Sequence, residues 1–76
     1  MNNSRRKRIN ESICLLEDAQ QKLREVLKEE QQALSSLPDN DEYDDMRDGM
    51  DNLISEMDDT ITSLDDALDT LNSSDF

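Results

Sequence analysis

Apolar residues in the first half of the chain recur alternately three and four positions apart, which is the spacing of one face of an α-helix. This series, the seam of the helix, consists of Ile9, Ile13, Leu16, Leu23, Leu27, Leu34 and Leu37. Gln20 and Glu30 fill its two gaps. Three small or apolar residues widen one flank of the seam: Ala19, Val26 and Ala33. The pattern predicts an amphipathic helix over about residues 5–36, capped by Ser4 or Asn10.

The second half shows the same alternation and predicts a second helix over about residues 40–72. Its seam is expected to consist of Tyr43, Met46, Met50, Leu53, Met57, Thr60, Leu64, Ala67 and Leu71. Three further apolar residues widen this seam as well: Ile54, Ile61 and Leu68.

The segment "SSLPDNDE" separates the two patterns. Pro38 cannot continue a helix, and Asp39 followed three residues later by Glu42 matches the pattern of a capping box. A turn over residues 37–39 is short enough to fold the second helix back along the first. We therefore predict an all-α fold, with one domain over residues 1–76 that forms an antiparallel two-helix hairpin.

Both predicted helices carry more apolar positions than a single antiparallel contact needs. We expect a homodimer, in which two hairpins form a four-helix bundle and bury the surplus. The oligomer interface is expected to consist of Ile13, Leu16, Ile54, Ile61 and Leu68. The alternative is a lone hairpin that leaves some Leu and Ile side chains exposed.

Composition narrows the possible function classes. The chain has one cysteine, Cys14, and no histidine, so it offers neither an internal disulfide nor the usual nucleophile and metal sites. A glycine-rich phosphate loop is absent, and the nearest approach to a calcium loop, which ends at Gly49, lacks two of its oxygen ligands. We expect no enzyme activity, no metal and no cofactor. The single cysteine and the short apolar runs favour the cytoplasm and argue against a membrane span.

Charge is distributed very unevenly along the chain. Residues 1–38 carry seven basic and six acidic groups, a net charge of +1, whereas residues 39–76 carry one basic and fourteen acidic groups, a net charge of −13. The two values add to the −12 of the whole chain. Such repulsion destabilises a compact state, and Asp is a poorer helix former than Glu, so folding alone does not require this choice.

Fourteen carboxylates on a helix of roughly 55 Å lie about 4 Å apart along the axis, close to the 3.4 Å between phosphates of one DNA strand. We therefore expect the second helix to imitate nucleic acid and to bind the basic groove of another protein. The partner-binding residues would be Asp44, Asp45, Asp48, Asp51, Asp58, Asp59, Asp65, Asp66 and Asp69. Arg47 would relieve repulsion within the helix or contact an acid of the partner. The alternative is an acidic face that only keeps the protein in solution.

A basic cluster at the N-terminus consists of Arg5, Arg6, Lys7 and Arg8. Positive charge in the first turn of a helix opposes the helix dipole and needs a reason. Asp65, Asp66 and Asp69 near the end of the second helix could neutralise the cluster in an antiparallel hairpin. Alternatively, the cluster binds an anion such as a nucleotide phosphate. Four basic residues without interleaved aromatic residues do not make a nucleic-acid-binding domain.

Gln20 and Glu30 are polar residues within an apolar seam. Polar residues at single seam positions usually set the register and the oligomeric state of paired helices. A buried acid/base or di-metal pair is the other interpretation, but bundle metal sites need Glu-x-x-His pairs, which this chain lacks.

The segments "RRKRI", "LLEDAQQKL", "EEQQALSSLP" and "MDNLISEMDDTITSLDDALDTL" resemble a group of short acidic two-helix proteins of phages and mobile elements of Gram-positive bacteria. The resemblance implies a bacterial host cell and a non-enzymatic inhibitor of a host defence or DNA-processing protein. The alternatives are an anti-defence sponge that sequesters a nucleotide through the basic cluster, and a purely structural oligomerisation module.

Overall fold

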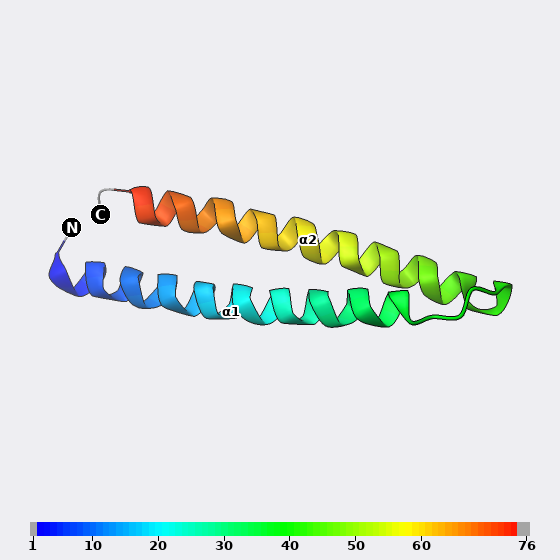
Figure 1. Cartoon of the computed structure of the whole chain (residues 1–76). Helices are drawn as coiled ribbons and strands as arrows, with labels where there is room; N and C mark the ends of the chain where they lie inside the picture. Colours follow the sequence, from blue (N-terminus) through cyan, green and yellow to red (C-terminus); the bar gives the residue numbers. More distant parts are fainter. Residues whose placement is uncertain (1, 75–76) are drawn as a thin grey trace.

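The computed structural model describes residues 2–74 of the chain. It contains two long α-helices, α1 (Asn3–Ser35) and α2 (Asp44–Ser73), and one short 3₁₀ helix, η1 (Asp41–Tyr43). The long helices lie side by side and run in opposite directions, so that the start of α1 and the end of α2 lie at the same end of the molecule (Figure 1). The result is a rod with extents of 60 × 15 × 13 Å. The predicted all-helical fold with two helices is confirmed, and no described residue forms a strand.

Helix α1 begins two residues earlier than predicted, and neither Ser4 nor Asn10 caps it. Its N-cap is Asn2, whose Oδ1 accepts a hydrogen bond from the backbone nitrogen of Arg5 at 2.9 Å. Because Arg and Lys have high helix propensity, the helix extends through the basic cluster and past Ser4 to Asn2, whose backbone is extended and whose side chain caps it. Both Ser4 and Asn10 are therefore interior residues.

The connection between the helices is longer than the predicted turn, and α2 begins at Asp44 instead of residue 40. The predicted capping box of Asp39 and Glu42 does not form. Instead, Asn40 adopts an extended backbone, and its Oδ1 accepts a hydrogen bond from the backbone nitrogen of Glu42 at 3.0 Å. The chain thus enters a 3₁₀ turn before the α-helix, which is a common way to begin a helix.

Arg47, the only basic residue of the second half, closes this connection. Its guanidinium donates hydrogen bonds to the backbone oxygen of Pro38 at 2.8 Å and to a carboxylate oxygen of Asp44 at 3.0 Å. Its side chain is 27% exposed and occupies a position of α2 that faces α1. Arg47 therefore relieves acidic repulsion within α2, as one of the two sequence interpretations holds, and also holds the end of α1 against the start of α2.

The seam of α1 is confirmed at every predicted position, including Gln20 and Glu30, because each of these residues is buried or half-buried. The seam of α2 differs from the prediction at every second position. It consists of Tyr43, Arg47, Met50, Ile54, Met57, Ile61, Leu64, Leu68 and Leu71. The predicted alternatives are exposed: Met46, Leu53, Thr60 and Ala67. Burying two Ile and a Leu removes more apolar surface from water than burying a Leu, a Thr and an Ala, so the larger column faces α1.

The five residues expected to join two copies lie instead within the contact between α1 and α2 of one chain. Ile13, Ile61 and Leu68 are buried there, and Leu16 and Ile54 are half-buried. Even so, the core is thin, since Gln20 is the only other described residue that is buried. A 76-residue chain folded as one helix pair leaves much apolar surface in contact with water.

Candidate functional site

The nine Asp residues predicted to bind a partner all lie on one side of α2. The seven-residue repeat of the helix places them in three neighbouring columns, which begin next to the seam and continue around the outer side. We call this surface the acidic arc; its residues are Asp44, Asp45, Asp48, Asp51, Asp58, Asp59, Asp65, Asp66 and Asp69. All nine are exposed, and the only other carboxylate of α2 belongs to Glu56. The structure adds where this side lies relative to α1, which depends on the column of α2 that faces α1.

The acidic arc is comparable with a nucleic acid strand in its length and in its mean charge density. From Asp44 to Asp69 the helix rises about 37 Å, at 1.5 Å per residue. Nine carboxylates over this length give one charge in about 4 Å, against one phosphate in 3.4 Å of a DNA strand. The arc therefore matches the charge density of one strand over about one turn of duplex.

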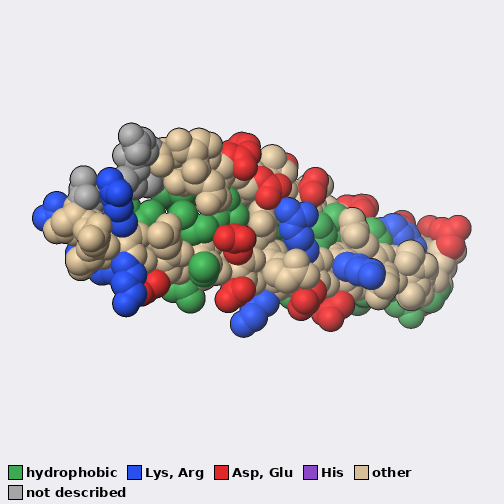
Figure 2. Space-filling view, turned by 60° about the vertical axis from the view of Figure 1, so that its left-hand side comes forward, with side chains coloured by type: hydrophobic (Ala, Val, Ile, Leu, Met, Phe, Trp, Pro, Cys, Tyr) green, Lys and Arg blue, Asp and Glu red, His purple; other side chains and the backbone are tan. Residues whose placement is uncertain are grey.

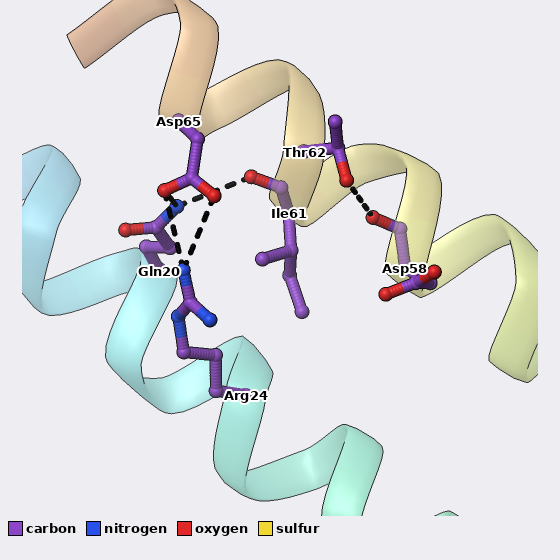
Figure 3. Close-up of polar contacts among 6 residues, drawn as sticks. All are labelled: Gln20, Arg24, Asp58, Ile61, Thr62 and Asp65. Carbon is purple, nitrogen blue, oxygen red and sulfur yellow. Dashed lines mark hydrogen bonds and ion pairs between the residues drawn. The ribbon is translucent and has the colours of Figure 1, made fainter. Parts of the chain in front are cut away.

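Two of the nine carboxylates are engaged within the chain. Asp44 pairs with Arg47 at 3.0 Å, and Asp65 pairs with Arg24 of α1 at 3.2 Å. Over residues 2–74, none of the other seven carboxylates has an ion-pair or hydrogen-bond partner. Asp58 is an example: Thr62 donates to its backbone oxygen at 3.0 Å, while the carboxylate points away (Figure 3). Seven unpaired charges thus remain available on the arc.

The contacts of Asp65 fix the position of the arc relative to α1. Gln20 is 8% exposed, and its side-chain nitrogen donates to the backbone oxygen of Ile61 at 3.1 Å and to the carboxylate of Asp65 at 2.6 Å. Arg24, one turn further along α1, donates to the same carboxylate (Figure 3). Because Gln20 would lose these partners in any other register, it selects this alignment of the two helices.

The basic cluster of Arg5, Arg6, Lys7 and Arg8 lies on the exposed first turns of α1. Basic side chains gather there at the end of the rod where α1 begins, whereas acidic ones are spread along its length (Figure 2). The cluster borders a hollow between the helices, to which Arg6, Leu71 and Ser74 contribute. Arg8 donates to the backbone oxygen of Ser4 at 3.4 Å.

The acids expected to neutralise this cluster lie further along the rod. Since Gln20 stands opposite Ile61, residues 65–69 stand opposite residues 12–16 of α1, which are one to two turns beyond Arg8. Asp65 pairs instead with Arg24, which lies further along α1 from the basic cluster.

Sequence reasoning missed the contacts of Arg47, Gln20 and Arg24, although each carries a signal in retrospect. Arg47 falls seven residues before Ile54, in the column that turns out to face α1. A single charged residue in an otherwise apolar column is typical of a side chain with a fixed polar partner. Gln20 was recognised as a seam residue, but its partner could be found only once the register was known.

No protein-family model, curated protein or solved structure matches the chain, so the comparisons identify neither a family nor a relative. Within residues 2–74 there is no group of His, Cys, Asp or Glu side chains arranged to hold a metal ion. Neither described long helix combines the length and the apolar character that crossing a membrane requires.

Proposed function

We propose that this protein is a non-enzymatic inhibitor, which presents the acidic arc of α2 to the basic nucleic-acid-binding groove of another protein. The observation that carries the proposal is the confinement of nine carboxylates, seven of them unpaired, to one side of one helix, at a mean spacing of about 4 Å against 3.4 Å between the phosphates of a DNA strand. A groove lined by Lys and Arg would attract this surface over several ångströms and bind it in place of nucleic acid.

The energetic cost of the arc supports a function beyond folding. Like charges three and four residues apart destabilise a helix by roughly 0.2–0.5 kcal/mol per pair. The arc contains several such pairs, for example Asp44 with Asp48, Asp45 with Asp48, and Asp48 with Asp51. A helix that only needed to stay in solution could mix Glu with Lys and gain stability from the same positions.

The partner in this proposal is a host defence or DNA-processing protein in the cytoplasm of a bacterial cell, the context implied by the resemblance to short acidic phage proteins. The scaffold is the antiparallel helical hairpin, and two copies form a four-helix bundle. Direct binding to nucleic acid is not part of the proposal, because the arc would repel phosphates.

Capture of partners from a bacterial lysate tests this proposal. The immobilised protein is expected to retain nucleic-acid-binding proteins at about 50 mM salt, to release them as salt rises, and to release them when duplex DNA is added. Replacement of the seven unpaired Asp residues by Asn removes their charge and leaves the contact between α1 and α2 unchanged. Capture should therefore be lost, while circular dichroism still shows the helices. Capture that survives this replacement, or resists both salt and DNA, would refute the proposal.

The second candidate function is sequestration of a nucleotide by the basic cluster. It is favoured by the position of Arg5, Lys7 and Arg8, which are exposed on the first turns of α1, where they oppose the helix dipole. Calorimetric titration with cyclic and linear signalling nucleotides should then give binding that is abolished by Arg5→Ala together with Arg8→Ala. The absence of heat with every nucleotide would eliminate this candidate.

A further inference from the structure

The helix pair has two long sides, and the acidic arc begins on one of them with the column of Asp44. The other side carries few charged residues. The Arg24–Asp65 ion pair shows which flanks of α1 and α2 lie together on the acidic side. Val26 lies two residues after Arg24, about 200° around the axis of α1, and Leu53 lies in the corresponding position two residues after Asp51 of the arc. The columns of Val26 and Leu53 therefore lie together on the other side of the pair. We call this side the neutral face.

The neutral face holds every large hydrophobic side chain that is exposed among the described residues. These are Leu15, Val26, Met46 and Leu53, which are 69%, 47%, 56% and 44% exposed. Between them lie small residues of the same columns: Ala19, Ala33 and Ala67. Exposed apolar side chains scattered around a rod need no explanation, but their restriction to one face indicates a contact surface.

The face is also nearly neutral in a strongly acidic chain. Its two columns on each helix contain three basic residues, Arg5, Arg8 and Lys22, and two acidic ones, Glu29 and Glu56, for a net charge of +1. The whole chain carries −12. Two copies of this chain repel each other along the acidic arc, whereas the neutral face carries little charge and allows them to approach closely along the length of the rod.

Along the neutral face, apolar side chains of α1 and α2 lie in pairs at the same height on the axis of the rod, and we call each such height a level. Because residues 20 and 61 stand opposite each other, Val26 and Leu53 lie within about 3 Å of the same level, and Ala33 and Met46 share the next level toward the turn. Each level thus contains one side chain from each helix, as in half of a four-helix bundle.

We propose that a second copy of this chain covers the neutral face, and that Val26 and Leu53 lie at the centre of the interface. A face 60 Å long and 15 Å wide offers about 900 Å² per chain, which meets the roughly 800 Å² per partner of a stable interface. This surface differs from the seam residues Ile13 and Ile61, which are buried within one chain. The inference names the surface through which two copies of the proposed bundle pair, and it does not depend on the inhibitor function, since the acidic arc faces away from the interface.

Charge also decides how the two copies are oriented. If the turns of the two chains lay at opposite ends, each α2 would lie against the α2 of the partner, and two segments with a net charge of −13 would be neighbours. If the turns lie at the same end, each α2 lies against α1 of the partner, which belongs to a half of the chain with a net charge of +1. This arrangement brings Lys22 within about one helical turn of Glu56 of the partner subunit. The geometry points to the second arrangement.

Sedimentation equilibrium tests the interface. The wild-type chain at 100 μM should have twice the 8.8 kDa mass of one chain. Val26→Glu or Leu53→Glu places an unpaired carboxylate in the interface and should weaken the dimer by at least about 100-fold. Ser55→Glu adds the same charge to the outer side of α2 and should leave the mass unchanged. A wild-type mass of 8.8 kDa, or a dimer that survives both substitutions, would overturn the inference.

Disulfide cross-linking covers the case in which the glutamate variants do not fold. In a Cys14→Ser background, chains with Val26→Cys mixed with chains with Leu53→Cys should form a mixed disulfide dimer under mild oxidation. Ser55→Cys chains should form at least about tenfold less dimer. If Thr60→Cys chains, whose cysteine lies in the same column near the middle of the rod, cross-link with one another as readily as the mixture, the α2 helices are neighbours and the proposed orientation is wrong. If Ser55→Cys cross-links best, the neutral face is not the interface.

Discussion

The two flanks of α2 belong to one helix and follow one seven-residue repeat, yet their compositions are opposite. The column on one flank of the seam is Asp44, Asp51, Asp58 and Asp65, and the column on the other flank is Met46, Leu53, Thr60 and Ala67. Both columns are exposed, so burial within one chain does not explain the difference. A need for solubility alone would place charge on both flanks. The contrast shows that the charge of these two columns is confined to one flank of the seam. Such confinement suits two different partners, one on each flank.

The largest expected effect concerns the seam that separates the two flanks. Ile61 is 4% exposed, and Ile61→Ala should lower the free energy of unfolding by about 2–4 kcal/mol, because it leaves a cavity between the helices. Urea denaturation followed by circular dichroism at one fixed protein concentration measures this change. Thr60→Ala, the exposed neighbour, should change it by less than about 0.5 kcal/mol. Equal losses for the two variants would contradict the placement of the seam.

The next effect concerns the turn from which both flanks begin. Arg47→Ala removes the hydrogen bond to the Pro38 carbonyl and the ion pair with Asp44, and should lower the free energy of unfolding by about 1–2 kcal/mol. Arg47→Lys keeps the charge but not the two-pronged geometry and should have an intermediate value. Lys28→Ala, on the exposed side of α1, is the matched control for loss of one positive charge. The same urea titration would contradict this role of Arg47 if Arg47→Ala and Lys28→Ala were equally stable.

The smallest expected effect sharpens the contrast between the flanks. Asp48→Asn should raise the free energy of unfolding by about 0.5 kcal/mol at 10 mM salt, because it relieves repulsion from three acidic neighbours one turn away. These neighbours are Asp44, Asp45 and Asp51. Asp51→Asn relieves repulsion from Asp48 alone and should gain less. Both gains should vanish in thermal or urea unfolding at 1 M salt, where screening acts within about 3 Å. A gain that persists at 1 M salt would have another cause.

The seam of α1 could be predicted from the sequence because only one series of Leu and Ile residues has helical spacing there. In α2 two columns compete to complete the seam, one headed by Met46 and Leu53 and the other by Arg47 and Ile54. Both columns border the same central series, so periodicity cannot choose between them. A charged residue at position 47 is also unusual for a column that faces another helix. The structure shows how this charge is accommodated, through a backbone carbonyl that no sequence pattern reveals.

The candidate site was predictable in its residues but not in its geometry. The nine Asp residues stand out by number, and helical periodicity groups them on one side of α2, whereas the position of that side relative to α1 depends on which column faces α1. The same correction moved Leu53 from the seam to the surface and thereby revealed the neutral face. The partners of Asp65 and Gln20 come from the other helix, more than 40 residues away along the chain, and follow only from the register.

The measurement that tests the central claim most directly compares two variants of equal net charge in the lysate capture experiment. One replaces Asp48, Asp51, Asp58 and Asp59 of the acidic arc by Asn, and the other replaces four exposed acids of α1 by their amides: Glu11, Glu17, Asp18 and Glu25. Both variants have a net charge of −8 in place of −12. The account predicts that the arc variant captures at least about tenfold less nucleic-acid-binding protein at 50 mM salt, while the α1 variant loses less than about twofold. Equal loss in the two variants, or no loss in the arc variant, would contradict the claim that the side on which charge lies determines what this protein binds.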